Sequence, residues 1–391
     1  MSDRLDAEQV LADAVAQAGS DDLGAATWQE GYERLLASLR TEAALSELGV
    51  EVARAELVGY LANRAALTAW RQAHPAETSG AITRPIFIVG QPRTGTTILF
   101  DLLAQDPAFR VPLTWEVDKP VPPPETATYD SDPRIDVAQA SLDMAESLMP
   151  GFTTFHPMGA RLGQECVRIT GHDFRSMIFP TQYHVPTYNR WLLHEADLGP
   201  AYTWHRSFLQ HLQSRHPGDQ WLLKSPAHLW HLDDLAREYP DAVVVQTHRD
   251  PLVVVASVSA LVTHLRRLAS DAGTLEQAAH SYADDIFVGL ERGMAARERG
   301  VLPPEQVVDV QFSSFVKDPL ATIGALYDAL GRPLTAEVEA RMRAFLTAHP
   351  GDGGGAGKRY RFSDTGLDAD PLRARAKDYQ DRYAVATETL T

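Results

Sequence analysis

The chain has 391 residues, 44% of them hydrophobic, and its 36 basic and 52 acidic side chains give a net charge of −16 at pH 7. This apolar content is sufficient for a folded core, and the acidic balance excludes a general nucleic-acid-binding protein. The single cysteine, Cys166, excludes a disulfide scaffold and a multi-cysteine metal site. Because the first residues are acidic and the longest apolar stretch, 252–262, is too short to cross a bilayer, we expect a cytoplasmic protein without a membrane span.

The N-terminal part of the chain has the leucine spacing of helices. Leucines recur at about helical intervals from Leu36 to Leu67, and a polar break follows at residues 76–80. We therefore predict a helical N-terminal extension over residues 1–80 and an α/β domain over residues 81–391.

Short apolar runs in the remainder of the chain are typical of buried strands, and helical patterns separate them. The strands are predicted at 85–89, 221–224, 242–247 and 307–312, and the helices at about 98–103, 228–239, from 251 onward and at 319–330. Strands that alternate with helices indicate a parallel sheet covered on both faces. The predicted fold class is therefore α/β, with a P-loop-like parallel sheet flanked by helices.

Two segments of this domain differ from the alternating pattern. Residues 117–215 begin with a proline-rich stretch and then mix helical patterns with many aromatic residues and histidines, so we predict a mostly helical insertion. Residues 351–357 are nearly all glycine, which predicts a flexible segment over 351–370.

A glycine-containing turn follows the first predicted strand. Residues 90–97 read Gly-Gln-Pro-Arg-Thr-Gly-Thr-Thr. A turn between a strand and a helix directs main-chain N–H groups and the positive end of the helix toward an anion. Arg93 adds a permanently charged donor fork, and Thr96 and Thr97 add hydroxyl groups. The turn predicts an anion-binding site.

The same turn differs from the loop of nucleotide triphosphatases. The spacing of Gly90 and Gly95 matches that loop, but Thr96 stands where it has a lysine. The neighbouring strand at 242–247 ends in Gln and Thr instead of a Mg²⁺-binding aspartate. We therefore expect anion binding without hydrolysis of ATP or GTP.

Residues 90–97 resemble the 5′-phosphosulfate loop of sulfotransferases that use 3′-phosphoadenosine 5′-phosphosulfate (PAPS). The similarity is to the bacterial, mycobacterial-type branch with the motif P-R-T-G-[ST]-T. The resemblance implies that the donor is PAPS, that no metal is needed, and that the insertion at 117–215 lies on the acceptor side. It also implies a set of donor-binding residues in this loop, which are Arg93, Thr94, Gly95, Thr96 and Thr97.

Two further motifs fit the same family. Residues 247–257 place Arg249 at the end of a strand and Ser257 eight residues later, and the resemblance implies that both bind the 3′-phosphate. The stretch Trp-Leu-Leu-Lys-Ser-Pro at 221–226 resembles the family's K-S-P motif, which implies that Lys224 contacts the bridging oxygen of the phosphosulfate.

A basic pair follows the glycine run near the C-terminus. Lys358 and Arg359 stand where many relatives carry an R-K-G triplet over the cofactor, although the order here differs. The resemblance implies that both contact the 3′-phosphate and that the segment 351–370 covers the donor.

Transfer of a sulfuryl group does not require the protein to form a covalent intermediate, so catalysis depends on positioning and on positive charge. Negative charge grows on the leaving phosphate oxygen, so Arg93 and Lys224 are predicted to stabilise the transition state. A hydroxyl acceptor must also lose a proton to a general base. Glu116, 23 residues after Arg93, and His228, four residues after Lys224, are the two candidates.

The resemblance implies that the acceptor is a hydroxylated small molecule, lipid or carbohydrate, and the sequence does not distinguish among these. Two alternatives stay open, which are a small-molecule kinase on the same fold and a non-catalytic protein that binds adenosine 3′,5′-bisphosphate. The oligomeric state is also left open.

Overall fold

The computed structural model describes residues 2–148, 158–349 and 361–390 of the chain. These residues divide into two compact units. Unit 1 comprises residues 1–82, 112–218 and 262–273, and unit 2 comprises residues 83–111, 219–261 and 274–391. Lys358 and Arg359 lie outside the described residues.

Unit 1 is built of helices. Its long helix α3 (Glu47–Ala73) begins where the Ser46 hydroxyl accepts a hydrogen bond from the Gly49 N–H, as expected of a serine N-cap. The other helices of this unit are α1 (Ala7–Ala18), α2 (Trp28–Thr41), α5 (Thr114–Asp118), α6 (Arg134–Leu148), α8 (Cys166–Thr170), α9 (Ile178–Gln182), α10 (Pro186–His194) and α11 (Gly199–Gln213).

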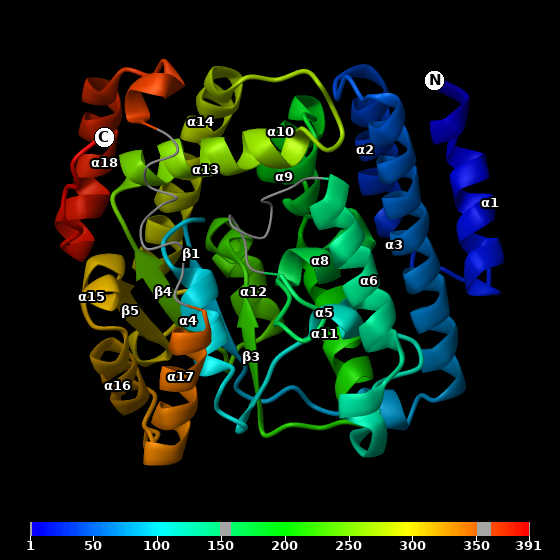
Figure 1. The fold of residues 1–391 in the computed structure, drawn as a ribbon, viewed down its shortest axis with the longest axis horizontal. Helices are drawn as coiled ribbons and strands as arrows, with labels where there is room; N and C mark the ends of the chain where they lie inside the picture. The colour runs from blue at the N-terminus through cyan, green and yellow to red at the C-terminus, as the bar shows by residue number, and fades with distance from the viewer. Residues whose placement is uncertain (1, 149–157, 350–360, 391) are drawn as a thin grey trace. The chain divides into compact units, whose positions relative to one another are not determined.

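Unit 2 contains a five-stranded parallel sheet with the strand order β2-β3-β1-β4-β5. Figure 1 shows β3, β1, β4 and β5 of this sheet. The strands are β1 (Ile86–Gly90), β2 (Phe109–Arg110), β3 (Gln220–Lys224), β4 (Val243–His248) and β5 (Val307–Gln311). The helices are α4 (Thr96–Leu103), α12 (Leu232–Glu238), α13 (Pro251–Arg266, whose last residues belong to unit 1), α14 (Leu275–Glu298), α15 (Phe312–Lys317), α16 (Pro319–Ala329), α17 (Ala336–Ala348) and α18 (Ala369–Tyr383).

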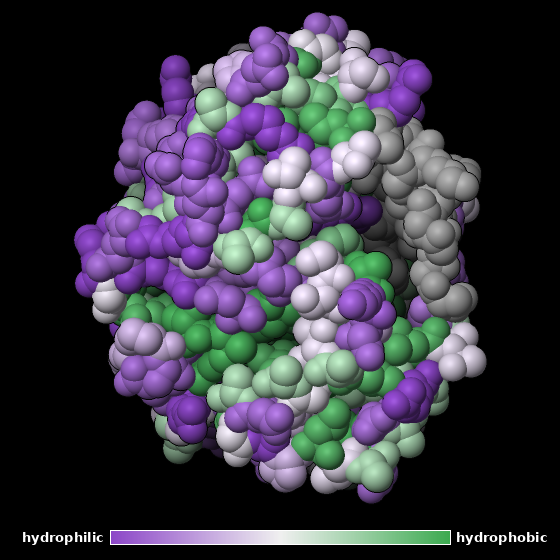
Figure 2. All heavy atoms as spheres, turned by 90° about the vertical axis from the view of Figure 1, so that its left-hand side faces the viewer, coloured by the Kyte–Doolittle hydropathy of each residue, from purple (hydrophilic) through white to green (hydrophobic). Residues whose placement is uncertain are grey.

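One side of unit 2 carries α18, α15 and α16. Figure 2 shows this side with hydrophilic residues over its upper part, where Figure 1 places α18, and with more apolar residues below. Ion pairs hold α18 to α14, because Arg375 contacts both Asp284 and Glu291 at 2.8 and 2.7 Å. A charged helix of this kind is typical of a solvated face.

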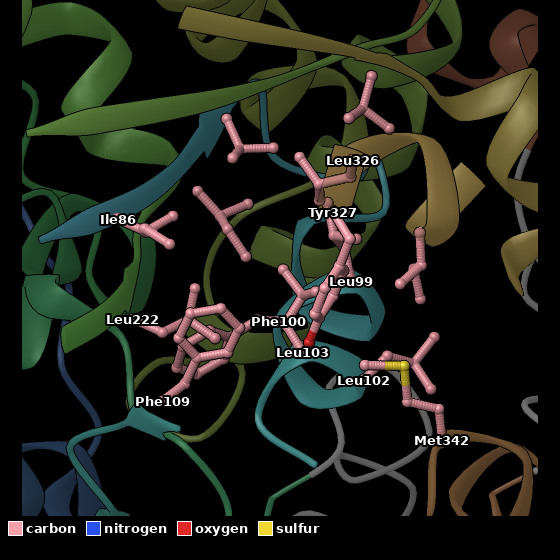
Figure 3. Packing of buried hydrophobic residues seen from close by; sticks show 14 of the residues in the cluster. Ile86, Leu99, Phe100, Leu102, Leu103, Phe109, Leu222, Leu326, Tyr327 and Met342 are labelled. Carbon is pink, nitrogen blue, oxygen red and sulfur yellow. The ribbon is translucent and has the colours of Figure 1, made fainter. Parts of the chain in front are cut away.

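A core cluster of unit 2 lies between one face of the sheet and the four helices α4, α15, α16 and α17. Ile86 of β1 and Leu222 of β3 pack with Phe100 and Leu103 of α4, and Met342 of α17 joins the same cluster (Figure 3). Alternate strand residues point to opposite faces of a sheet, so Ile86 and Leu222 share this face while Phe87 points to the other. Strands β1, β3 and β4 are buried almost throughout, as the sequence predicts for a covered parallel sheet, whereas in the edge strand β5 only Val310 is buried.

Some element boundaries differ from the sequence prediction. The helix expected at 228–239 begins only at Leu232, because a 3-10 turn at Pro226–His231 precedes it and His231 has a non-helical backbone. The strand expected at 307–312 ends at Gln311, and Phe312 begins α15. The described part of the chain contains no helix that is both long enough and apolar enough to cross a membrane.

Candidate functional site

The loop between β1 and α4 has the backbone of an anion-binding turn. Arg93 and Gly95 have positive φ angles of 68° and 85°. Gly95 is the N-cap of α4, so no capping side chain covers the N-terminus of this helix. Left-handed residues in a turn direct successive main-chain N–H groups toward the same side, and the first N–H groups of α4 have no intrahelical acceptor. The loop therefore presents several N–H donors in front of a helix N-terminus.

Two glycines allow the loop to lie close to its neighbours. A Cβ atom on Gly90 would lie 2.3 Å from the hydroxyl of Thr247, and a Cβ atom on Gly95 would lie 2.9 Å from the ring of Phe312. Both glycines also have positive φ angles, which side chains disfavour. The loop therefore depends on glycine at both positions for space as well as for backbone conformation.

Thr94 fixes the loop from within. Its hydroxyl donates a 2.6 Å hydrogen bond to the carbonyl of Gln91 and lies 2.6 Å from the hydroxyl of Thr247 on β4. The side chain of Gln91 is also held, because its Nε2 donates to the carbonyl of Ile286 at 2.9 Å. Thr94 was predicted to bind the donor, and the structure uses its hydroxyl to hold the loop against β4.

The two predicted phosphate motifs meet at this loop. The Nε of Arg93 donates a 3.1 Å hydrogen bond to the hydroxyl of Ser257, and Nη1 of Arg249 donates a 3.0 Å hydrogen bond to the carbonyl of Arg93. The parallel register of β1 and β4 explains the meeting, since Gly90 pairs with Thr247 at the ends of the two strands. The structure therefore brings Arg93, Arg249 and Ser257 together in unit 2.

Arg249 is held on three sides. Its guanidinium lies 4.2 Å from the centre of the Phe312 ring, which is a cation–π distance. Its Nε and Nη2 donate to the two carboxylate oxygens of Glu388 at 2.9 and 3.0 Å. Nη1 bonds to the loop carbonyl, so the orientation of the guanidinium is fixed.

Lys224 lies at the carboxyl end of β3, next to the loop. It pairs with Ile88 of β1, its exposed fraction is 1%, and its Nζ donates a 3.2 Å hydrogen bond to the hydroxyl of Thr97. Buried lysines are rare unless a partner or a ligand shares their charge. The structure thus places Lys224 at the first turn of α4, beside the anion-binding turn.

His228 lies on the other face of the sheet. Its ring packs edge-on against Phe87 with the ring centres 5.0 Å apart, and both side chains are buried. Phe87 and Ile88 point to opposite faces of β1, and Lys224 is in register with Ile88. The structure therefore separates the ring of His228 from the face that carries Lys224.

Glu116 belongs to unit 1, where it lies in the first turn of α5. Its side chain is fully buried, and its Oε2 accepts a 2.7 Å hydrogen bond from the Leu113 N–H. This contact is the N-terminal capping arrangement of a short helix. The role of Glu116 as general base stays a prediction.

A partly buried network that the sequence analysis did not identify supports the strand end before Arg249. His248 contacts Asp309 through Nε2 and the hydroxyl of Tyr379 through Nδ1, both at 2.8 Å. Burial raises the pKa of Asp309, but hydrogen bonds from His248 and Arg297 outweigh it and hold that pKa below its usual value. The only sequence signal for this network is the position of His248 directly before Arg249.

Three further residues contact the loop or Arg249, although the sequence analysis did not assign them to the site. They are Thr247, Phe312 and Glu388. Thr247 could have been identified as a loop contact from the sequence, because it stands at the end of a buried strand that is predicted to lie beside the glycine loop. Phe312 was considered as an adenine-packing or a core residue, and it packs against Arg249 and Gly95. Glu388 belongs to no recognisable motif, and only the fold brings it to Arg249.

The residues assembled here define a class of site. Arg93, Lys224 and Arg249 supply positive charge, and Ser257 and Thr97 supply hydroxyl groups, around an α4 N-terminus. Such a donor set fits a ligand with more than one anionic group. Unit 2 is therefore an α/β domain in which these basic and hydroxyl side chains gather at a P-loop-like turn.

Comparison with known proteins gives the family. The model of the sulfotransferase family matches residues 85–336, so the chain belongs to the sulfotransferase family. Over 273 residues the chain is 25% identical to omega-hydroxy-beta-dihydromenaquinone-9 sulfotransferase Stf3 of Mycobacterium bovis, and the match covers 68% of this chain and 67% of that protein. The expectation of a PAPS-dependent sulfotransferase family member, and hence of an enzyme, is confirmed.

Solved structures share the fold over nearly the whole chain. Sulfotransferase STF1 of Mycobacterium tuberculosis is 32% identical, with a TM-score of 0.83, covering 95% of this chain and 98% of that one. Sulfotransferase STF9 of Mycobacterium avium is 29% identical, with a TM-score of 0.87, covering 98% of this chain and 97% of that one. The predicted α/β, P-loop-like fold class is confirmed by both.

Proposed function

We propose that this enzyme transfers the sulfuryl group of PAPS to a hydroxyl group of an acceptor and releases adenosine 3′,5′-bisphosphate. The observation that carries the proposal is the convergence of Arg93, Arg249 and Ser257 through two hydrogen bonds of 3.1 and 3.0 Å. PAPS carries anionic groups on both its 5′ and 3′ sides, so it needs two sets of donors in one site. A nucleoside triphosphate carries its charge on one side only.

Arg249 and Ser257 are the proposed ligands of the 3′-phosphate. The planar fork of an arginine matches two oxygens of a phosphate, and a nearby hydroxyl can donate to a third. Lys358 and Arg359 are proposed to add charge to the same group, on the strength of the family resemblance alone. The fixed orientation of Arg249 over Phe312 favours binding, because little side-chain freedom is lost when the phosphate arrives.

The 5′-phosphosulfate is proposed to bind at the loop. The N–H groups of Thr94, Gly95, Thr96 and Thr97 and the side chain of Arg93 supply donors there. Donors that are already in place stabilise charge as it develops, without the reorganisation that water would need. The loop is suited to this task because hydrogen bonds and close packing fix its backbone before any ligand binds.

Lys224 is proposed to stabilise the leaving oxygen. Its ammonium group is buried and already bonded to Thr97 at the start of α4. As the bond from sulfur to the bridging oxygen breaks, negative charge grows on that oxygen, and a nearby ammonium group lowers the energy of the transition state. In this role Lys224 stays protonated throughout the reaction and acts through its charge.

The acceptor hydroxyl must give up a proton, and Glu116 is the proposed base, with His228 as the alternative. The position of the His228 ring, against Phe87 and away from the face of Lys224, supports the preference for Glu116. A carboxylate can accept the proton directly once the acceptor hydroxyl lies within hydrogen-bond distance.

The acceptor is proposed to be a hydroxylated small molecule, lipid or carbohydrate. The curated relative Stf3 carries the name of a hydroxylated menaquinone, so we place an isoprenoid alcohol first in the search. The many aromatic residues of unit 1, with Phe174, Phe179 and Tyr188 among those that are buried, are consistent with an apolar acceptor.

A direct experiment tests the proposal. The full chain is incubated with PAPS and separate pools of isoprenoid alcohols, phenols and sugars, and mass spectrometry records products that gain one SO₃ group together with released adenosine 3′,5′-bisphosphate. Parallel reactions contain ATP in place of PAPS. A sulfated product with PAPS and no phosphorylated product with ATP is expected. Phosphorylated products with ATP, without any sulfated product, would overturn the proposal.

A further inference from the structure

The C-terminal residues hold a carboxylate on the face of Arg249 that a phosphate would need. Nε and Nη2 form the edge of a guanidinium that grips two oxygens at once. In this structure the two oxygens belong to Glu388, at 2.9 and 3.0 Å. The remaining nitrogen, Nη1, bonds to the carbonyl of Arg93. One such edge cannot hold a carboxylate and a phosphate in the same geometry.

The position of Glu388 is set by its backbone. Its N–H donates a 2.7 Å hydrogen bond to Oδ2 of Asp250, and its carbonyl accepts from Nη2 of Arg373 at 3.3 Å. Arg373 in turn forms an ion pair with Asp250 at 2.6 Å. These contacts place the carboxylate next to Arg249, because Asp250 follows Arg249 directly in the chain.

The segment that carries Glu388 is anchored lightly. After α18, Val385 is buried, whereas Ala386, Thr387 and Thr389 are exposed. An open depression of about 600 Å³ lies beside this segment, lined in part by Lys377, Gln380, Val385 and Thr387. A segment with one buried side chain and a few hydrogen bonds opens at low free energy.

We propose that Glu388 is a built-in competitor of the 3′-phosphate, and this inference rests on the proposed function of Arg249. The carboxylate occupies the guanidinium when no nucleotide is bound, and the 3′-phosphate displaces it. The affinity for donor and product is then lower than the intrinsic affinity by the fraction of molecules in which Glu388 has left. Because the competitor is tethered, its effective concentration is high and does not depend on the concentration of the protein.

The competitor has a direct effect on turnover. Adenosine 3′,5′-bisphosphate carries the same 3′-phosphate as PAPS, so it would otherwise keep the site occupied after transfer. Return of Glu388 to Arg249 weakens the hold on this product and favours its release. Nucleotides without a 3′-phosphate do not contact Arg249, so Glu388 does not change their affinity.

The test uses the full chain and isothermal titration calorimetry with adenosine 3′,5′-bisphosphate and with adenosine 5′-monophosphate. Glu388→Gln, which keeps the shape and removes the charge, is expected to tighten bisphosphate binding about tenfold and to leave the monophosphate unchanged. The exposed Glu305→Gln variant is the matched control for loss of one negative charge, and its affinities should equal those of the wild type. A chain that ends at Ala386 is the second variant and should show the same gain.

The outcomes separate this inference from the proposed function. In an Arg249→Ala background, Glu388→Gln should give no gain, because the site of competition is gone. Unchanged or weaker bisphosphate binding in both Glu388 variants overturns the competitor role. If the wild type binds the bisphosphate no better than the monophosphate, and Arg249→Ala has no effect, then the proposed function itself fails.

Discussion

The Nη1 of Arg249 donates a hydrogen bond of 3.0 Å to the carbonyl oxygen of Arg93, although 156 residues separate the two in the chain. Arg93 lies in the loop after β1 and Arg249 directly after β4, and these strands are neighbours in the sheet. The contact ties the two halves of the proposed donor site to one another. Changes at either arginine should therefore be felt in the binding of the same nucleotide.

Replacement of Arg249 by alanine is expected to weaken adenosine 3′,5′-bisphosphate on the order of 10- to 100-fold, since one charge-assisted bidentate contact is lost. Binding of adenosine 5′-monophosphate should change little. Calorimetry with both nucleotides gives the comparison. Arg249→Lys should recover only part of the affinity, because an ammonium group lacks the planar fork. Equal losses for the two nucleotides would remove the 3′-phosphate role.

Replacement of Lys224 by methionine is expected to lower kcat by roughly 10²–10³, with a smaller change in KM for PAPS. Methionine keeps an apolar stem in a position that is 1% exposed, so the fold should be retained. Lys377→Met, at an exposed lysine that pairs with Asp381, is the control and should leave kcat unchanged. Steady-state rates of sulfation measure both. A Lys224→Met enzyme with normal kcat would rule out a role in the transition state.

The choice between the two candidate bases needs separate variants. Glu116→Gln retains an oxygen that can accept from the Leu113 N–H, so it removes the basicity while it keeps the helix cap. We expect this variant to lose most of kcat and His228→Asn to keep it. The rates are measured with the acceptor found in the screen. A fall in kcat for His228→Asn alone would assign the proton transfer to His228, and no fall in either would exclude both.

Gly95→Ala tests the backbone of the loop. The φ angle of 85° and the Phe312 ring at 2.9 Å from the added Cβ are expected to lower the free energy of unfolding by about 1–2 kcal/mol. Gly324→Ala is the matched control, since Gly324 lies within α16 with no neighbour near the new Cβ. There alanine should raise stability by up to about 1 kcal/mol. Urea denaturation measures both, and equal effects would contradict the strain at Gly95.

Stability should fall in mild acid because of buried histidines. Burial, together with the charge of Arg292, lowers the pKa of His231 from 6.5 to about 3. Between these two pH values the unfolded chain binds the proton and the folded chain does not, so the free energy of unfolding decreases as pH falls below 6.5. For one such histidine the loss at pH 5 is about 2 kcal/mol.

The measurement is urea denaturation at pH 7.5 and at pH 5. His231→Leu should show a smaller loss between the two pH values than the wild type. Leu235→Ala, a core substitution in α12 without a titratable group, should lower stability equally at both. A pH dependence in His231→Leu equal to that of the wild type would show that His231 takes up its proton in the folded state.

The sequence predicted the strands and the anion-binding turn because both depend on local patterns. Runs such as 85–89 are apolar throughout, and Gly90 and Gly95 mark a turn that side chains disfavour. Strand β2 was missed because it has only two residues, and the strand order depends on contacts between distant segments. The length of the helix before β4 was overestimated, since a 3-10 turn and an apolar helix have similar patterns over six residues.

The individual contacts of the candidate site could not be predicted as well from the sequence. The motifs predicted that Arg93, Arg249 and Ser257 act on one ligand, but not that Arg93 donates to Ser257 directly. Glu388 could not be identified at all, because a single carboxylate in a polar terminus has no local signature. Its role depends on the path of the chain after α18, which only tertiary structure defines.

The pairing of Gly90 with Thr247 has a consequence for how such enzymes diversify. The distance between the loop after β1 and Arg249 after β4 is determined by where these two adjacent strands end. It does not depend on the length of the polypeptide that connects them. Residues 112–218 can therefore change in length and sequence without disturbing the geometry of the proposed nucleotide site. The same arrangement of the proposed donor site is therefore compatible with many different acceptor-binding segments.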